Sequence, residues 1–368
     1  MLALSGSGGY YSLSTKLTSM KLLLAALTLT VAPVAAQGLG QGTSDAPVAG
    51  WATADPDSLG LSLAVLDAHL DLCRRSRADG CLVAYKGQIV QEWYGPNYAL
   101  PLVGGGLERS MRSVGKSVAS LLAGMLVGDG ALSVGDPTER WIPEWEAGAD
   151  SAVTVDHLLT MTAGLPRAFG CPEDQPDCTE DYTAFALSLP LAHAPGTRMV
   201  YSNEGAQLLS PVLERAAGVP LHEYARTRLF EPLALDSTSM GTDPAGNTST
   251  VGGPLTTLRE AAALGQLVEN GGAWNGEQVV PAEWIEAMCE PNPSYPYYGR
   301  LWWVDEAAGV CFAGGDLDNI IAVYPEDDLV VVRTQFTPDP RAEVQYLSPS
   351  TFHLLRGLPE MRLQPQED

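Results

Sequence analysis

Residues 113–130 read Ser-Val-Gly-Lys-Ser-Val-Ala-Ser-Leu-Leu-Ala-Gly-Met-Leu-Val-Gly-Asp-Gly, and this stretch decides how the rest of the sequence is interpreted. Its apolar side chains recur at helical spacing, and the Gly-Asp-Gly that follows is typical of a helix end. The pattern predicts a helix that begins near Ser113 and ends at residues 128–130. Because residues three apart share a helix face, the Lys116 amine can reach back one turn to the Ser113 hydroxyl.

The two residues of this Ser-x-x-Lys pair are of the types that can act as a nucleophile and its base. A serine hydroxyl is a poor nucleophile until a neighbour removes its proton, and a lysine desolvated in a cleft favours the neutral amine that can do so. The helix N-terminus also presents free backbone N–H groups, among them that of Ser113, to a developing oxyanion. The alternative is a surface serine beside a solvated lysine, which is the usual meaning of an isolated Ser-x-x-Lys.

Composition and charge narrow the classes of function. The 368 residues carry 21 Lys plus Arg against 44 Asp plus Glu, a net charge of −23, and the 45% hydrophobic content supports a real core. An acid excess of this size repels phosphate backbones and anionic headgroups, so it disfavours nucleic-acid binding and peripheral membrane binding. Lysine is scarce, which makes each one informative: Lys16, Lys21, Lys86 and Lys116.

The N-terminal residues predict export. From Met20, a possible true start, a short charged segment, an apolar run and a small-residue cleavage site follow one another, which indicates a signal peptide over residues 1–36. The alternative is an uncleaved N-terminal anchor. Residues 37–57 are expected to be a flexible leader, residues 58–360 a single catalytic domain and residues 361–368 a tail. We therefore expect a secreted or periplasmic protein with no membrane span after cleavage.

Six cysteines fit an oxidising compartment, and six allow fifteen disulfide connectivities. Local pairing is the simplest prediction, with Cys73 bonded to Cys81, Cys171 to Cys178, and Cys289 to Cys311. A zinc site is less favoured, because the spacings are not Cys-x-x-Cys pairs and no histidine is adjacent.

Strand patterns lie at both ends of the chain and helical patterns lie between them. Alternating or apolar runs predict a hairpin over residues 81–93, with its turn at Lys86-Gly87, and further strands over 298–304, 309–313, 319–324 and 329–335. Helices are predicted over residues 63–73, 204–217, 221–229, 257–270 and 348–356. This order predicts an α+β fold, an α/β sandwich in which an antiparallel sheet from both chain ends (about 58–105 and 250–360) is flanked by helices and receives a mainly helical insertion (about 106–250).

A second polar motif follows the first. Residues 195–203 read as a turn, a short extended piece and a helix start, and they end in Tyr201-Ser202-Asn203. Tyr201 could share one proton with Ser113 and Lys116, which supplies an acid and a base for acyl transfer without a histidine. Alone the motif is weak, since Ser202 or Asn203 could simply cap the helix.

Three rival sites fit less well. Residues 110–117 match a phosphate-binding loop except that Ser110 replaces the first glycine, and an exported acidic protein is a poor nucleotide binder. No Gly-x-Ser-x-Gly occurs, so a Ser-His-Asp hydrolase is disfavoured, and the five histidines are scattered. No His-Glu-x-x-His or paired-histidine spacing points to a metal. We therefore predict no metal and no organic cofactor.

In combination these motifs resemble the serine β-lactamase and penicillin-binding-protein superfamily, and most of all its branch of esterases and amide hydrolases such as the 6-aminohexanoate-dimer hydrolases. The resemblance covers roughly residues 58–355. It rests on residues 113–120, 129–137, 155–164, 195–203, 252–255 and 298–303. It implies that Ser113 is the acylated nucleophile, that Lys116 and Tyr201 are the base and proton relay, and that Asn203 is a substrate-orienting amide.

The third motif of this superfamily departs from its pattern. In place of Lys-Thr-Gly or His-x-Gly the chain reads Ala313-Gly314-Gly315, followed by Asp316-Leu317-Asp318. A backbone N–H near Gly315 or Asp316 can still complete an oxyanion hole, but the cation that holds a substrate carboxylate is missing. Asp316 and Asp318 would repel such a carboxylate, unless Arg300 or Arg333 replaces the cation.

The sequence thus predicts an exported serine hydrolase that cleaves a small-molecule ester or amide through an acyl-enzyme on Ser113, with carboxylesterase or amide hydrolase activity favoured. A β-lactamase or D-alanyl-D-alanine carboxypeptidase is the alternative within this class. An alternative of another class is a catalytically silent binding protein on the same fold. The sequence makes no prediction of oligomeric state.

Overall fold

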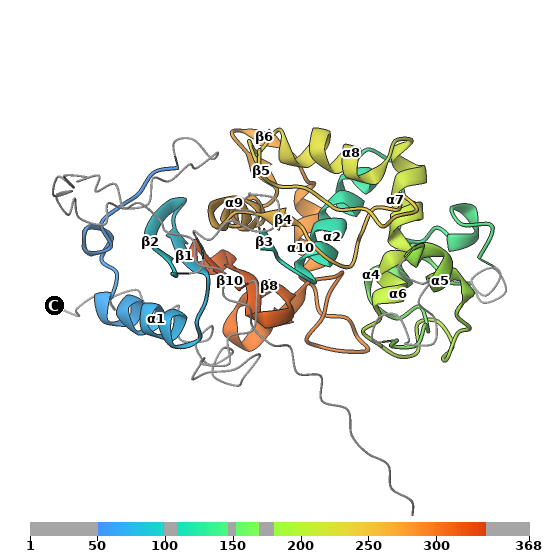
Figure 1. Cartoon of the computed structure of the whole chain (residues 1–368), viewed down its shortest axis with the longest axis horizontal. Coiled ribbons are helices and arrows are strands. Elements are labelled where there is room, and N and C mark those ends of the chain that lie inside the picture. Colours follow the sequence, from blue (N-terminus) through green and yellow to red (C-terminus); the bar gives the residue numbers. More distant parts are fainter. Residues whose placement is uncertain (1–50, 97, 99–108, 146–151, 169–179, 336–368) are drawn as a thin grey trace, which may run out of the picture. The chain divides into compact units, whose positions relative to one another are not determined.

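The computed structural model describes residues 51–96, 98, 109–145, 152–168 and 180–335. Its main feature is a six-stranded antiparallel sheet in the order β2-β1-β10-β9-β8-β7. The strands are β1 (Gly80–Tyr85), β2 (Gln88–Tyr94), β7 (Trp303–Asp305), β8 (Val310–Gly315), β9 (Asn319–Tyr324) and β10 (Leu329–Thr334). Because β1 pairs with β10, the sheet joins N-terminal and C-terminal parts of the described chain, as predicted (Figure 1).

The sheet is covered on both faces, because its side chains alternate between two apolar layers. Val83, Phe312 and Tyr324 share one layer with Leu66 of α1 (Leu63–Arg75). Leu82, Ile321 and Val330 belong to the larger core, which also contains the apolar residues of α2 (Val114–Gly128) and α9 (Leu258–Glu269). This arrangement is the predicted α+β sandwich.

Short segments next to the strands complete the sheet. Lys86 and Gly87 adopt left-handed backbone conformations (φ 50° and 70°) and close the β1–β2 hairpin. Residues 52–54, which belong to the expected flexible leader, pair with β2, since Ile89 donates to Ala52 and Ala54 donates to Ile89. Smaller pairs of strands are β3 (Arg109–Ser110) with β4 (Leu255–Thr256) and β5 (Ala273–Trp274) with β6 (Glu277–Gln278).

Helices fill the middle of the chain. They are α4 (Val155–Leu159), α5 (Tyr182–Ser188), α6 (Asn203–Gln207), α7 (Leu209–Ala217), α8 (Leu221–Ala225) and α10 (Ala282–Met288), with a π-helical turn over Arg226–Phe230. Side-chain oxygens cap several of them, as at Thr154, Ser202 and Thr257. Single 3₁₀ turns lie at Asp57–Leu59, Thr138–Arg140, Glu306–Ala308, Asp316–Asp318 and Pro325–Asp327.

Two predicted elements are wrong in extent. The helix predicted over 204–217 is divided at Leu208 into α6 and α7. Of the strand predicted over 298–304, only Trp303 and Val304 belong to a strand, β7, because Leu301 adopts φ 62° and its carbonyl accepts from the Ser117 hydroxyl at 2.7 Å. The hydrogen bond to Ser117 of α2 thus outweighs the strand preference of the residues around Leu301. The helix predicted over 348–356 lies outside the described residues.

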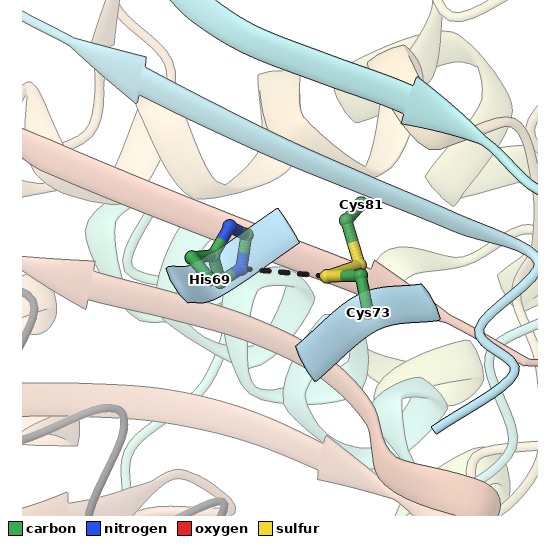
Figure 2. Close-up of side chains that lie close together, drawn as sticks. All are labelled: His69, Cys73 and Cys81. Carbon is green, nitrogen blue, oxygen red and sulfur yellow. Dashed lines mark hydrogen bonds between the residues drawn. A yellow bond between two sulfur atoms is a disulfide. The ribbon is translucent and has the colours of Figure 1, made fainter. Parts of the chain in front are cut away.

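Two of the predicted disulfides are confirmed, Cys73–Cys81 and Cys289–Cys311. The predicted Cys171–Cys178 bond lies outside the described residues. Figure 2 shows the first bond beside the buried His69, whose Nε2 lies 3.7 Å from the Cys73 Sγ and whose Nδ1 lies 2.7 Å from the Gln91 Oε1. The three possible ligand atoms lie within 4.8 Å of one another, but the bonded sulfurs offer no thiolates to a metal.

None of the helices in the described part of the chain has the length and the apolar character needed to cross a bilayer.

The longer disulfide loop is expected to contribute more stability. In the chain-entropy model, a loop closed over a separation of 22 residues gives about 3.4 kcal/mol and one closed over 8 residues about 2.5 kcal/mol. We predict that Cys289→Ala/Cys311→Ala lowers the free energy of unfolding more than Cys73→Ala/Cys81→Ala does, as measured by urea unfolding of the two double variants. Equal losses, or a larger loss for the shorter loop, would contradict this ranking.

Candidate active site

Ser113 stands at the N-cap position of α2, directly after Arg112, whose backbone is left-handed (φ 56°). A serine in this position commonly accepts a hydrogen bond from a backbone N–H of the first turn. Ser113 makes no such cap bond, and its backbone is helical rather than extended. Its hydroxyl oxygen instead accepts from the Lys116 Nζ at 3.2 Å, as the sequence predicted. The side chain is therefore directed to the lysine and not used to cap the helix.

Lys116 is buried in the protein, with 1% of its surface exposed. Its Nζ donates to the Val251 carbonyl at 2.9 Å as well as to Ser113. Burial lowers the pKa of Lys116 to about 7, and the negative charge of Glu204 acts in the opposite direction. Near neutral pH a large fraction of this amine is thus unprotonated, the form that can accept a proton from a hydroxyl.

The Val251 carbonyl, which is distant from Lys116 in sequence, can approach the lysine because residue 115 is a glycine. A Cβ at Gly115 would lie 2.9 Å from each of the Gly252 and Gly253 carbonyl oxygens. Only a residue without a side chain allows this loop to lie against the first turn of α2. Pairing of β3 with β4 and the bond from the Met111 N–H to the Pro254 carbonyl attach the same loop to the segment before Ser113.

Tyr201 borders the pair, in a cluster of aromatic rings. Its ring is stacked on Trp303 at 5.8 Å and meets Tyr298 edge-on at 6.1 Å, while the Lys116 Nζ lies 5.1 Å from its centroid. Burial raises the pKa of Tyr201, and a hydrogen bond with Ser113 partly opposes this increase. The phenol is therefore protonated at neutral pH and can act as a proton donor. The Val200 N–H donates to the Met161 carbonyl and fixes the segment that carries it.

Asn203 is the first residue of α6, and Ser202 is the residue that caps the helix, by accepting from the Gly205 N–H at 3.1 Å. Among the residues that the structure describes, the buried Asn203 Oδ1 has no hydrogen-bond partner. Buried polar atoms are nearly always paired in folded proteins, so this amide is a natural partner for a bound molecule.

Strand β8, which carries Ala313-Gly314-Gly315, lies directly against Ser113. A Cβ at Gly315 would lie 2.2 Å from the Met111 carbonyl oxygen and 3.2 Å from the Ser113 nitrogen. Gly315 ends β8, and the exposed Asp316 follows, with a charge that raises the pKa of Tyr201. The structure thus brings Ser113, Gly315 and Asp316 together at the end of the sheet.

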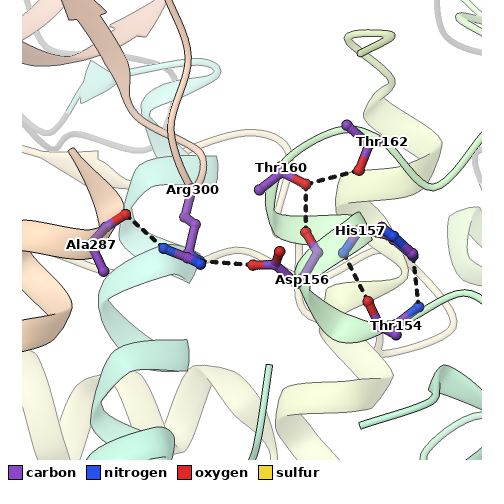
Figure 3. A network of polar contacts seen from close by, with 7 residues as sticks. All are labelled: Thr154, Asp156, His157, Thr160, Thr162, Ala287 and Arg300. Atoms are coloured by element: carbon purple, nitrogen blue, oxygen red, sulfur yellow. Dashed lines mark hydrogen bonds and ion pairs between the residues drawn. The ribbon is translucent and has the colours of Figure 1, made fainter. Parts of the chain in front are cut away.

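Neither arginine that might have replaced the missing cation is directed to Ser113. The Arg300 Nε donates to the Asp156 Oδ1 at 2.8 Å and its Nη1 to the Ala287 carbonyl, as Figure 3 shows. Arg333 is buried and donates to the carbonyl oxygens of Leu317 and Asp318 at 2.8 and 2.9 Å, which fixes the left-handed turn after Asp316. In the same network, His157 forms a capping box with Thr154 and so has a structural role.

Sequence reasoning missed three groups near the site. The Val251 carbonyl is 135 residues away from Lys116 in sequence, and no local signal marks it. Arg167 lies on an exposed loop, and its positive charge lowers the pKa of Tyr201. Glu204 follows Asn203 and is fully buried. From sequence, an acid in the first turn of a helix is normally interpreted as a surface charge that interacts favourably with the helix dipole.

Comparison with known proteins identifies the family of the chain. A family model described as Beta-lactamase matches residues 109–345. The chain is 32% identical over 136 residues to a protein named Beta-lactamase of Escherichia coli K12, covering 36% of this chain and 35% of that protein. It is 31% identical over 217 residues to Esterase EstB of Burkholderia gladioli, covering 50% and 54%. The chain thus spans about a third and about half of the lengths of these two relatives.

Two further proteins match most of the chain at lower identity. A 6-aminohexanoate-dimer hydrolase of Paenarthrobacter ureafaciens is 22% identical, with 77% of this chain and 78% of that protein covered. A solved structure described as a putative 6-aminohexanoate-dimer hydrolase from Bacillus anthracis aligns with a TM-score of 0.65 at 18% identity, covering 80% and 83%. This structural likeness shows a shared fold. Because the family model covers the greater part of the chain, the protein belongs to the beta-lactamase family, whose relatives are serine hydrolases that act on ester or amide bonds.

Proposed function

We propose that the protein is an exported serine hydrolase that cleaves an ester or amide bond through an acyl-enzyme on Ser113. The observation that carries this proposal is the buried Lys116 amine, 3.2 Å from the Ser113 hydroxyl and with a pKa of about 7. A lysine buried in this way is an effective base near neutral pH, and the serine it contacts is not used as a helix cap.

In the proposed reaction the neutral Lys116 amine takes the Ser113 proton as Oγ attacks the substrate carbonyl. The oxyanion is bound by the Ser113 N–H and by an N–H at Gly315 or Asp316, and collapse of this intermediate releases the alcohol or amine. The protonated phenol of Tyr201 passes a proton to the leaving group, and its supply is renewed from Lys116. Water then attacks the acyl-enzyme by the reverse route and frees Ser113.

The charges around Ser113 favour a substrate that is bound without an ion pair between its carboxylate and a cation of the protein. Ala313 occupies the place where the superfamily resemblance expects a cation, Asp316 is exposed beside the site, and both Arg300 and Arg333 are bonded elsewhere. The relatives named esterase and 6-aminohexanoate-dimer hydrolase support a carboxylesterase or amide hydrolase.

A β-lactamase or D-alanyl-D-alanine carboxypeptidase is the second candidate, and two observations favour it. The Escherichia coli relative is named Beta-lactamase, and the positive charge of Arg167 acts on Tyr201. Rapid turnover of a chromogenic cephalosporin, without hydrolysis of short p-nitrophenyl esters, would place this candidate first.

Export is supported by the two disulfides, which persist in oxidising compartments. Mass spectrometry of the protein isolated from its native host, with the mature N-terminus near residue 37 and recovery outside the cytoplasm, would test this part of the proposal.

Labelling distinguishes an enzyme from a catalytically silent binding protein. We predict that a fluorophosphonate labels Ser113 in the folded protein and that Lys116→Met lowers ester hydrolysis by roughly 10²–10⁴-fold, the usual contribution of a positioned base. Peptide mapping identifies the labelled residue, and Lys86→Met, at the hairpin turn, is the matched control with unchanged activity. An unlabelled Ser113 in folded protein would remove the catalytic proposal.

The rate should follow the titration of Lys116. Because the neutral amine is the base and its pKa is about 7, kcat/KM is expected to increase as pH rises through 7 and to level off above it. Initial rates between pH 5 and 9 (roughly two units on either side of that value) check this. A rate that is constant across pH 6–8 would exclude Lys116 as the titrating base.

Gly315→Ala should damage the oxyanion hole, because its Cβ would lie 2.2 Å from a backbone oxygen that cannot yield easily. Loss of one oxyanion donor costs roughly 10²–10³ in kcat. The matched control is Gly314→Ala, whose Cβ would meet side chains rather than backbone, those of Trp303 at 3.1 Å and Phe312 at 3.5 Å, and should cost much less. Steady-state kinetics and melting of both variants test the difference, and equal kcat values would contradict it.

A further inference from the structure

The turn that follows β8, over residues 316–318, has an unusual backbone. Leu317 and Asp318 both adopt left-handed conformations, with φ 67° and 57°. Residues with a side chain rarely do so, and a leucine less often than an aspartate, because the Cβ crowds the backbone there. A glycine at either position would take the same conformation without this cost. The 316–318 turn therefore has to be held by contacts from outside its own three residues.

Two side chains supply these contacts, and together they bind all three carbonyl groups of the turn. The Asn319 Nδ2 donates to the Asp316 carbonyl at 2.7 Å. The Arg333 Nη1 donates to the carbonyl oxygens of Leu317 and Asp318 at 2.8 and 2.9 Å. Because a peptide group is planar, each of these bonds also restricts the direction of the N–H on the other side of that group. The 316–318 turn is thus restrained at every one of its peptide groups.

Both side chains are in turn fixed by other parts of the fold. Asn319 is fully buried, its Nδ2 also donates to the Gln335 carbonyl, and its Oδ1 accepts from the Gln335 N–H at 2.8 Å. Arg333 extends from β10, and its Nη2 donates to the Ser76 Oγ, at the end of α1, at 3.1 Å. The same Nη2 donates to the Gln335 Oε1 at 2.6 Å. Both side chains therefore act on the backbone of the turn and not on a substrate.

The 316–318 turn begins at the place where the proposed reaction develops its negative charge. Gly315, the residue before the turn, lies so close to the nucleophile that a Cβ there would be 3.2 Å from the Ser113 nitrogen. The peptide group between Gly315 and Asp316 carries one of the two candidate oxyanion donors, and the next peptide group is the one that Asn319 binds. A donor of this kind contributes to catalysis only when it is directed at the position of the oxyanion.

We propose that Arg333 and Asn319 are positioning residues whose hydrogen bonds to the 316–318 turn hold a backbone N–H of Gly315 or Asp316 in the direction of the oxyanion. The inference rests on the proposed function, in which Ser113 forms the acyl-enzyme. A donor fixed before the substrate binds needs no reorganisation when the charge develops, which is the condition for strong electrostatic stabilisation. Arg333 thus assists the reaction through the backbone, without contact with the substrate.

The test is Arg333→Met, which removes the hydrogen bonds to Leu317 and Asp318 and keeps a long side chain. We expect kcat for an ester to fall roughly 10–10²-fold with KM unchanged, because the lost stabilisation is made only in the transition state. The specific readout compares an ester with its thionoester, in which sulfur replaces the carbonyl oxygen. Because sulfur is a weak hydrogen-bond acceptor, the preference for the ester reports on the oxyanion hole. Steady-state kinetics should show this preference falling by a factor similar to that of kcat.

Arg259→Met is the matched control. Arg259, on α9, donates to both carboxylate oxygens of Glu92, on β2, at 2.7 and 2.6 Å. Its replacement also removes two arginine hydrogen bonds that hold the sheet to a neighbouring segment, but none to the 316–318 turn. This variant should melt at a lower temperature and keep the wild-type preference for the ester. An equal loss of preference in the two variants would show that Arg333 acts through stability alone and would exclude the inference.

The outcomes separate the inference from the function on which it rests. If a fluorophosphonate labels Ser113 but Arg333→Met keeps the wild-type preference for the ester, the positioning role is excluded and the hydrolase proposal stands. If Ser113 is not labelled, the function itself fails. Should Arg333→Met not fold, Arg333→Lys takes its place, because a compact ammonium cannot reach the turn, Ser76 and Gln335 at once. Its preference for the ester must then lie below that of the wild type, and an unchanged preference would equally exclude the inference.

Discussion

The structure around the site depends on one constraint, the burial of the Lys116 amine against Ser113. An amine in this position loses its water, so its hydrogen bonds have to come from the protein, and the Val251 carbonyl and the Ser113 hydroxyl provide them. The Val251 loop can approach only because Gly115 has no side chain. Burial also moves the pKa of the lysine to about 7. The packing that makes the amine difficult to solvate is thus the same packing that makes it a usable base.

The site lies where the sheet and the helical middle of the chain meet. β8 contributes Gly315, whose backbone lies against Met111 and Ser113. The helical part contributes Tyr201 and Asn203, on a segment fixed by the bond from Val200 to Met161. Trp303, at the start of β7, stacks on Tyr201 and joins the two regions through an aromatic contact. Each candidate catalytic group is therefore held by an element of regular structure or lies close to the end of one, which favours a fixed geometry.

Charged groups of both signs act on the site, although the chain as a whole is strongly acidic. Glu204 and Asp316 are opposed by Arg167 and by the partly protonated Lys116. Arg333 uses its charge structurally, on the carbonyl groups of the turn after Asp316, rather than for substrate binding.

The features that are encoded locally could be predicted from the sequence. Helical spacing places Ser113 and Lys116 one turn apart, period-two alternation marks the strands, and short Cys separations gave the two confirmed disulfides. It could not place the Val251 carbonyl or the charge of Arg167, since each acts on the site through space from a distant segment. Nor could it show that Glu204, the neighbour of Asn203, is fully buried. Nor could it foresee that residues 298–302 leave the strand pattern, because their conformation follows from docking on Ser117. Periodicity reports which residues share a face of one element, whereas pKa values and orphaned polar atoms arise from what covers that face, and only the tertiary structure decides that.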